Sequence, residues 1–317
     1  IYVGEVWLNS GQSNSQLNMD RMRFSYSDEY ENLEDKNIRV ITIPISYSFD
    51  GTVDFIENPL WLDVKKENLS EISGTSFFFA KKLWEDLNVP IGIINASQGG
   101  SPICSWMSYD SLDNLNYKDL TDRVKQWKNK SILEKKISSE KAKENLWNRE
   151  IFENDPGLYN GWNNIPYSEL SSSWKECEIP NDFYDLNKAG VCWFKKQVYI
   201  SKEQLEHFNS KETYLWLGTI VDSDIAYVNG VQVGITYYSY PPRRYIVPKG
   251  ILKEGENTIS IRVQKNGIGP LRFFKEKPYY LFTEDEKIIP VVSKNVEYEL
   301  AKKYTEMEDK STGVRIK

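Results

Sequence analysis

The stretch from Gly4 to Asn14, GEVWLNSGQSN, constrains the fold most, because it has the pattern of a buried strand that runs straight into a tight turn. Glu5 to Leu8 has the β-branched and aromatic content of a strand, and Gly11 follows where the backbone must turn. Nucleophilic hydrolases present a serine in this way, since its Oγ then lies beside backbone N–H donors. Ser13 is therefore our candidate nucleophile, and the alternative is an ordinary turn or helix cap.

A second glycine-rich stretch, PIGIINASQGGSPICSWM, runs from Pro90 to Met107. Ile91 to Ile94 is a continuous apolar run, as expected of a parallel strand that is covered on both faces. Small side chains follow it, at Asn95, Ser97, Gly99 and Gly100, and let a substrate approach the backbone. Because both strands finish in small-residue turns, we expect these turns at the same carboxyl edge of one sheet, where open α/β sheets bind ligands.

Both stretches resemble motifs of the sialate O-acetylesterase family, carbohydrate esterases with the SGNH hydrolase fold. GEVWLNSGQSN resembles the first block of the family, and FFFAKKLWEDLNVPIGIINASQGGSPICSWMS resembles the segment that carries its second block. The resemblance implies Ser13 as nucleophile, with the backbone N–H groups of Ser13 and Gly100 as oxyanion donors. It implies close approach at Gly99, and Gln12 and Asn14 as further oxyanion or substrate-binding residues.

The chain departs from the family pattern at three positions. Asn9 stands where the family commonly has cysteine, Ser15 where it has methionine and Gln98 where it has tryptophan. None of these changes removes a catalytic group, and Ser15 and Gln98 bear on the shape of the pocket.

Composition excludes several classes of partner. The chain has 317 residues, of which 40% are hydrophobic and 27% charged, as in soluble globular proteins with room for two domains. A net charge of -6 without a Lys/Arg cluster argues against a nucleic-acid partner. No apolar run is long enough to span a bilayer.

The cysteines are Cys104, Cys177 and Cys192, an odd number without the spacing of metal ligands. The sequence therefore indicates neither a disulfide framework nor a zinc site, while a single Cys177–Cys192 pair stays open. No other ligand cluster suggests a catalytic metal, and we expect no cofactor.

The order of elements predicts two kinds of structure in one chain. A helix expected from Gly74 to Asn88 leads into the strand at Ile91, which is the order of a parallel α/β layer. Turn formers crowd the segment from Asp155 to Pro166 and mark a domain boundary. From Trp174 onward, short β runs predict an all-β sandwich or jelly roll. The runs are Val191 to Ile200, Thr213 to Leu217, Ile225 to Val228, Val231 to Val233 and Thr258 to Val263, with an Asn229-Gly230 hairpin signal.

The β runs GVCWFKKQVYI, DSDIAYVNGVQVG, YPPRRYIVP and GENTISIRV resemble the family's inserted galactose-binding-like jelly roll. We therefore expect an α/β plus all-β chain. Residues 1–160 would form the N-terminal portion of an SGNH hydrolase domain, a flavodoxin-like three-layer α/β/α structure. Residues 161–295 would form the inserted β domain, and residues 296–317 a linker toward a missing second half of the hydrolase domain.

The segment from Tyr237 to Tyr245, YYSYPPRRY, permits two interpretations. It could be a sugar platform built from aromatic rings and Arg243 or Arg244. We favour a structural role, in which the prolines fix a loop and the arginines pair with acids such as Asp222 and Asp224.

A serine esterase needs a base beside the nucleophile, and histidine is the usual one. The chain has one histidine, His207, in the charged stretch SKEQLEHFNS between two β runs. Gln204 stands three residues before it, so the Asp-x-x-His pair typical of the fold is absent there. We expect His207 to have a solvent-exposed structural role.

In the family, the segment after the insert carries a Gln-Gly-Glu-Ser-Asn block and the Asp and His, and neither block occurs here before Lys317. The resemblance implies a fragment of a carbohydrate O-acetylesterase for O-acetylated sialic acid or related glycans. We expect it to be inactive alone and to take its acid–base pair from a complementary C-terminal fragment. Bacterial members of the family are usually exported, so we expect a periplasmic or extracellular location. The alternative is a non-catalytic carbohydrate-binding protein that acts through its β domain.

Overall fold

A computed structural model describes residues 2–23, 25–33, 35–46, 48–49, 51–284, 286–291 and 293–303. The chain divides into two units, Ile1–Ile137 and Ser138–Lys317, each with its own packing. The part of the expected linker from 304 to 317 lies outside the described residues. The domain boundaries expected from the sequence stay a prediction.

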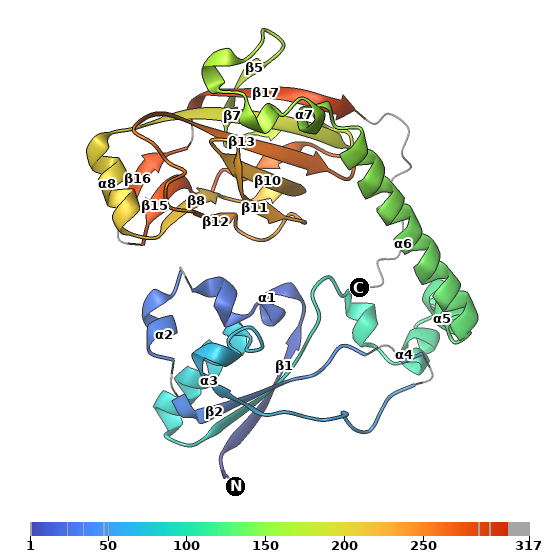
Figure 1. The fold of residues 1–317 in the computed structure, drawn as a ribbon. Helices are drawn as coiled ribbons and strands as arrows, with labels where there is room; N and C mark the ends of the chain where they lie inside the picture. The colour runs from blue at the N-terminus through green and yellow to red at the C-terminus, as the bar shows by residue number, and fades with distance from the viewer. Residues whose placement is uncertain are drawn as a thin grey trace. The chain divides into compact units, whose positions relative to one another are not determined.

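Unit 1 contains a four-stranded sheet in which β4 (Ile91–Ser97) lies between β1 (Glu5–Gly11) and β2 (Asp35–Thr42) and runs parallel to both. The fourth strand, β3 (Leu62–Val64), pairs antiparallel with β2. The predicted strands at Glu5 and Ile91 are confirmed, and β1 is an edge strand among the described residues (Figure 1).

The helix α3 (Gly74–Leu87) packs on β2 and β4 of this sheet (Figure 1). Ser73 caps its N-terminus, because its hydroxyl accepts a hydrogen bond from the Ser76 N–H at 3.2 Å. Asn88, in the left-handed conformation with φ 52°, ends it. The helix and the sheet enclose the core of unit 1, which consists of Met19, Leu33, Ile38, Val40, Val64, Leu69, Ile72, Phe77, Ala80, Ile91 and Ile93.

Short helices complete unit 1. Those before α3 are α1 (Ser13–Gln16), α2 (Ser27–Glu31) and 3-10 turns at Met19–Met22 and Lys66–Asn68. Those after β4 are a 3-10 turn at Ile103–Trp106, α4 (Tyr109–Asn114) and α5 (Lys118–Trp127), and α6 (Lys130–Glu153) runs across the division between the units. In the part of the chain that the structure describes, no helix has the length and apolar composition needed to cross a membrane.

Unit 2 is built from antiparallel sheets (Figure 1). The six-stranded sheet has the order β11 (Val231–Thr236), β10 (Ser223–Val228), β13 (Gly255–Lys265), β7 (Gly190–Ile200), β17 (Ser293–Lys303), β5 (Lys175–Ile179). The four-stranded sheet has the order β12 (Arg244–Val247), β8 (Thr213–Leu217), β15 (Tyr279–Thr283), β16 (Glu286–Pro290). A small sheet holds β6 (Asp182–Phe183), β14 (Leu271–Phe273) and β9 (Ile220–Val221).

The predicted Asn229-Gly230 hairpin is confirmed. Val228 at the end of β10 pairs with Val231 at the start of β11, and the two residues between them have positive φ angles of 49° and 82°. Asparagine and glycine tolerate these angles at low cost, which is why this dipeptide sets the register of the hairpin.

The main core of unit 2 lies between the six-stranded and four-stranded sheets, since Phe194 and Ile261 of the first share it with Leu215 and Leu281 of the second. The other face of the six-stranded sheet packs Trp193 and Tyr227 against Trp147 and Ile151 of α6. Further short helices are α7 (Pro156–Tyr159), α8 (Lys202–Ser210) and 3-10 turns at Trp162–Asn164 and Tyr167–Glu169.

Asp155, in the segment rich in turn formers, is fully buried in unit 2. Its carboxylate lies 2.6 Å from the Arg262 Nε and accepts a hydrogen bond from the Trp193 indole N–H at 3.2 Å. The predicted combination of an α/β part with a β-rich part is confirmed, and the three-layer and jelly-roll arrangements stay predictions.

Candidate active site

The two turns expected to meet do lie side by side at the carboxyl ends of β1 and β4. Gly11 is paired in register with Ser97, and the Gln98 N–H donates a hydrogen bond to the Gly11 carbonyl at 3.0 Å. A Cβ at Gly11 would stand 2.6 Å from the Ser15 Oγ, and the φ of +155° is one that other residues rarely adopt, so this turn favours glycine.

Ser13 is the first residue of α1 and follows directly after the Gln12 cap position. Gln12, Ser13 and Asn14 are all exposed. Within the part of the chain that the structure describes, neither the hydroxyl nor the backbone N–H of Ser13 has a hydrogen-bond partner. The hydroxyl is therefore open to a substrate, and the N–H is open to an oxyanion.

Gly99 lies directly against the Ser13 turn. Its backbone N–H donates a hydrogen bond to the Gln16 Oε1 at 2.7 Å. A Cβ at Gly99 would stand 2.8 Å from that Oε1 and 3.6 Å from the Ser13 Cα. The expected close approach at Gly99 thus has a geometric basis, and the N–H of Gly99 is already occupied by Gln16.

Gly100 is the exposed residue that follows. It has a φ of +78°, a left-handed conformation that favours glycine, and a Cβ there would meet nothing within 4 Å. Its open surroundings distinguish it from Gly99 and leave Ser13 and Gly100 as the two candidate oxyanion donors.

A polar network lies beneath the two turns. The Asn9 Nδ2 donates to the Asn95 Oδ1 at 3.1 Å and to the Ser76 Oγ at 2.9 Å. The Ser97 hydroxyl donates to the same Asn95 oxygen at 2.7 Å, and Asn95 is only 2% exposed. These bonds join β1, β4 and α3, so Asn9, which departs from the family pattern, has a definite structural role.

The helix α1 is also held from the side of α3. The Ser73 hydroxyl donates to the Ser15 carbonyl at 2.6 Å, and the Thr75 hydroxyl donates to the Asn14 carbonyl at 3.1 Å. The Gly74 N–H adds a bond to the Leu17 carbonyl at 2.8 Å. The N-terminus of α3 thus fixes the height of the Ser13 turn above the sheet.

Neither turn supplies a general base. The sequences NSGQSNSQ at 9–16 and NASQGGS at 95–101 contain no acidic, basic or histidine side chain. His207 lies on α8 of unit 2, where its Nε2 stands 3.0 Å from the Thr283 hydroxyl. Its side chain is half-buried there, so the expectation that it is solvent-exposed was wrong.

Sequence reasoning missed Gln16 and Ser76, which hold the site together. Both are polar residues on short or capped helices, and their partners Gly99 and Asn9 are 83 and 67 residues away in the chain. The side-chain oxygen of Gln98 is buried without a hydrogen-bond partner among the described residues.

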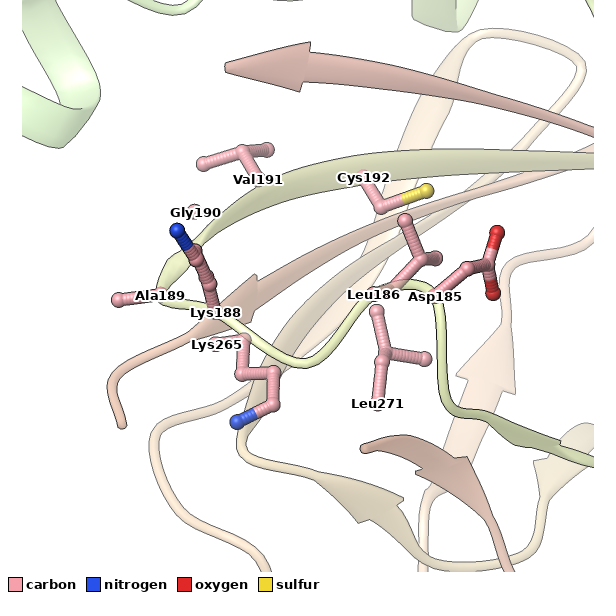
Figure 2. Close-up of a pocket in the computed structure, with 9 residues that line it drawn as sticks. All are labelled: Asp185, Leu186, Lys188, Ala189, Gly190, Val191, Cys192, Lys265 and Leu271. Atoms are coloured by element: carbon pink, nitrogen blue, oxygen red, sulfur yellow. The ribbon is translucent and has the colours of Figure 1, made fainter. Parts of the chain in front are cut away.

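Unit 2 contains a shallow pocket that is partly open to solvent (Figure 2). It holds none of the residues predicted for catalysis. Burial lowers the pKa of Lys265 at its wall, and the ammonium group of this lysine donates to the Gly267 carbonyl. The lining residues are Asp185, Leu186, Lys188, Ala189, Gly190, Val191, Cys192, Lys265 and Leu271.

Cys104, Cys177 and Cys192 are thiols, so the Cys177–Cys192 disulfide that the sequence left open is not formed. Within the described ranges, no three side chains of His, Cys, Asp or Glu are grouped to hold a metal ion.

Residues 3–139 match the family described as carbohydrate esterase, sialic acid-specific acetylesterase. This part of the chain is similar to the sialate O-acetylesterase family. The match confirms the resemblance predicted from the two glycine-rich turns, and it covers the sheet, α3 and both turns of unit 1.

The curated sialate O-acetylesterases of Pongo abelii and Homo sapiens are each 31% identical to the chain over 119 residues. The match covers 35% of this chain and 23% of each relative, so the chain spans about a quarter of the length of the curated relatives it matches. Among solved structures, a carbohydrate acetylesterase from Xanthomonas citri is 32% identical, with a TM-score of 0.32 over 35% of this chain and 25% of that one. A β-glucuronidase from Ruminococcus gnavus is 18% identical, with a TM-score of 0.30 over 45% of this chain and 26% of that one.

Proposed function

We propose that unit 1 carries the nucleophile of a carbohydrate O-acetylesterase that acts on O-acetylated sialic acid or related glycans. The observation that supports this most is the contact of the two turns: the Ser13 hydroxyl is exposed and unpartnered among the described residues, and Gly99 lies directly against it. The match of residues 3–139 to the sialic acid-specific acetylesterases supports an acetyl ester as the bond that is cleaved and a glycan as the substrate. A periplasmic or extracellular location is part of the same proposal.

In the proposed mechanism, the Ser13 Oγ attacks the acetyl carbonyl carbon and a base takes the hydroxyl proton. The carbonyl oxygen becomes an oxyanion, which the N–H groups of Ser13 and Gly100 stabilise. The tetrahedral intermediate collapses, the base returns the proton to the sugar oxygen, and the sugar leaves. Water then attacks the acetyl ester on Ser13 while the same base takes a proton from the water, and the base returns this proton to the Ser13 Oγ as acetate is released. Gln12 and Asn14 would bind the substrate beside the nucleophile.

The base is proposed to come from a complementary C-terminal fragment with an Asp and a His, because the two turns contain no titratable side chain. The edge strand β1 supports this. Its outer edge has no partner strand among the described residues, and Val6 and Leu8, on the sheet face opposite α3, are 63% and 67% exposed. Apolar strands of this kind are normally covered. The proposal therefore includes a three-layer SGNH domain completed by that fragment, with unit 2 as a jelly-roll insert.

The test begins with intact mass spectrometry of the purified sample under denaturing conditions, to detect a second polypeptide. Hydrolysis of 4-nitrophenyl acetate and of O-acetylated sialic acid is then measured for the chain alone and with the fragment. We expect no hydrolysis by the chain alone and, with the fragment, a hydrolysis that Ser13→Ala abolishes and Ser10→Ala leaves intact. Activity of the lone chain that Ser13→Ala removes would overturn the fragment requirement, and activity that survives Ser13→Ala would overturn the nucleophile.

A further inference from the structure

Residues 237–242, with the sequence YYSYPP, form most of the connection between β11 and β12 and expose three aromatic rings, and we name this segment the tyrosine loop. Tyr237, Tyr238 and Tyr240 are 76%, 47% and 78% exposed. The rings of Tyr238 and Tyr240 lie 6.4 Å apart between centroids at an angle of 64°. The two rings are therefore steeply inclined to each other, so that a ligand can stack on one ring and contact the other from the side.

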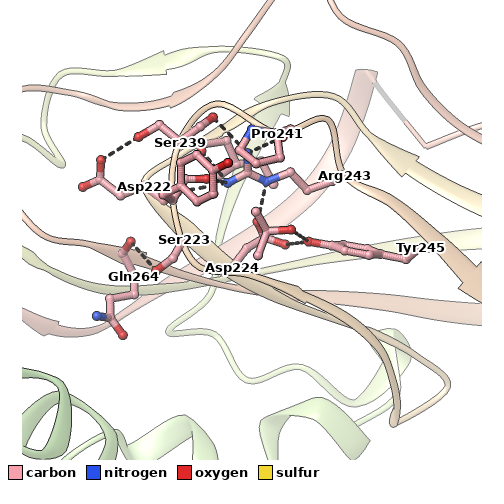
Figure 3. A network of polar contacts seen from close by, with 11 residues as sticks. Asp222, Ser223, Asp224, Ser239, Pro241, Arg243, Tyr245 and Gln264 are labelled. Atoms are coloured by element: carbon pink, nitrogen blue, oxygen red, sulfur yellow. Dashed lines mark hydrogen bonds and ion pairs between the residues drawn. The ribbon is translucent and has the colours of Figure 1, made fainter. Parts of the chain in front are cut away.

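Arg243 holds this loop from inside the unit, although its own side chain is fully buried. Its guanidinium donates to three carbonyl oxygens of the loop, those of Tyr238 at 3.0 Å, Ser239 at 2.9 Å and Pro241 at 2.7 Å. It also donates to the sheet, at the carbonyls of Ile220 and Asp222 and the carboxylate of Asp224 (Figure 3). One buried cation thus ties the loop backbone to β9 and β10.

A second tie lies beside the first. The Ser239 hydroxyl donates to the Asp222 Oδ1 at 3.0 Å (Figure 3). The other oxygen of that carboxylate accepts a hydrogen bond from the Asn266 N–H at 2.7 Å. The two prolines restrict the backbone further. Rigid aromatic side chains bind with little loss of conformational freedom, so the loop presents its rings in a form prepared for a ligand.

We infer that the tyrosine loop of unit 2 is a binding site for a neutral glycan, and this inference does not depend on the proposed esterase function. The exposed tyrosines of the loop carry hydroxyl groups and no charge, which fits pyranose rings with an apolar C–H face and hydroxyls around the edge. A protein partner would require about 20 to 30 residues on this side, and the loop supplies only a few. Of the two arginines that follow, Arg243 is buried against Asp224, and Arg244 lies over the Trp216 ring, 4.1 Å from its centroid.

The test is calorimetric titration of the full chain carrying Ser13→Ala with xylohexaose, cellohexaose and mannohexaose, which have no acetyl groups. We expect at least one of them to bind, and Tyr238→Ala/Tyr240→Ala to weaken that binding by about tenfold through the loss of two stacking surfaces. The matched control is Tyr184→Ala/Tyr199→Ala, which removes two tyrosines that are each 69% exposed outside the loop and should leave the affinity unchanged.

Absence of binding by all three oligosaccharides would overturn the inference, as would equal losses in the loop variant and the control. Sedimentation of the wild-type chain and the loop variant tests a second copy as occupant. A dimer that dissociates on Tyr238→Ala/Tyr240→Ala would also overturn the glycan assignment. Since neither readout depends on ester hydrolysis, failure here leaves the proposed role of Ser13 untouched.

Discussion

The Gly99 N–H donates a hydrogen bond of 2.7 Å to the Gln16 side-chain oxygen, and this bond joins the turn after β4 to the helix that begins with Ser13. It has two consequences for the chemistry. It removes Gly99 from the set of available oxyanion donors, and it holds the next residue, Gly100, in a fixed position relative to Ser13. Gln16 is thus a positioning residue of the proposed site.

We therefore expect Gln16→Leu to release the second turn and Gln16→Glu to retain it, because a carboxylate still accepts the Gly99 N–H. Amide hydrogen exchange of Gly99 should become faster in the leucine variant and remain near wild type in the glutamate variant. The stability loss for leucine should be about 1 kcal/mol, the usual net value of one hydrogen bond. Unchanged exchange at Gly99 in Gln16→Leu would show that other contacts hold the turn.

His207 is expected to have no part in ester hydrolysis. Its imidazole is hydrogen-bonded to the Thr283 hydroxyl at 3.0 Å in unit 2. The helix α8 that carries it is stabilised at its N-terminus by a capping box between Ser201 and Gln204. In the enzyme completed by its second fragment, His207→Gln should keep the wild-type kcat within about twofold, whereas loss of a true general base costs about 100-fold or more. A loss of that size in His207→Gln would show that this histidine acts in catalysis.

Local patterns predicted much of the fold. The strands β1 and β4, the helix α3 and the Asn229-Gly230 hairpin follow from side-chain period and turn chemistry within a few residues. Contacts between distant segments could not be predicted in this way. The Asn9–Asn95 bond spans 86 residues and the Arg262–Asp155 ion pair spans 107, so both depend on a sheet register that no local pattern encodes.

The same limit explains the error at His207. Its charged sequence neighbourhood favoured exposure, but the residue that its ring contacts, Thr283, is 76 positions away. Arg243 shows the opposite case, because the predicted pairing with an acid of β10 is confirmed by the 2.6 Å distance to Asp224. Arg243 is close in the chain to the acids of β10, so few other partners compete for it. A histidine on a surface helix can meet many different partners.

Arg243 and Arg244 provide a matched pair for a stability test. Arg243→Met should cost about 3 to 5 kcal/mol in the free energy of unfolding, because it leaves the fully buried carboxylate of Asp224 without its cation. Arg244→Met should cost less than Arg243→Met, because Arg244 is only half-buried and its contact with the Trp216 ring is worth about 1 kcal/mol. Urea unfolding followed by tryptophan fluorescence measures both. Equal costs for the two neighbours would contradict the assignment of Arg243 as the internal tie of the loop.

The Tyr245 hydroxyl donates to the other oxygen of Asp224 at 2.7 Å, and burial raises the pKa of this tyrosine beyond the ordinary range. Tyr245→Phe should therefore cost about 1 kcal/mol, far less than Arg243→Met, because the carboxylate keeps its ion pair. A cost for Tyr245→Phe equal to that of Arg243→Met would show that the hydroxyl, and not the guanidinium, stabilises the buried charge. The same urea titration decides between them.

Lys195 on β7 makes the free energy of unfolding of unit 2 depend on pH, and the sign of this dependence follows from its lowered pKa. Its side chain is 1% exposed and donates to the Ile165 carbonyl at 2.7 Å and the Ser260 hydroxyl at 2.9 Å, while burial lowers its pKa to about 8. Below that pH Lys195 is protonated in both the folded and the unfolded chain, so it does not change the free energy of unfolding as the pH varies. Above it the unfolded chain binds more protons, and stability should rise with pH by up to about 1.4 kcal/mol per unit until the ordinary pKa of lysine is reached.

The measurement is urea unfolding from pH 7 to about 9.5, below the range in which tyrosines ionise in the unfolded chain. Lys195→Met should remove the part of the rise that begins near pH 8, and Lys202→Met, at an exposed position on α8, should leave it in place. Burial also lowers the pKa of Lys196 and Lys265, which contribute in the same direction in both variants. The difference between the two variants therefore isolates Lys195, and identical pH profiles would mean that its ammonium group is solvated in the folded state.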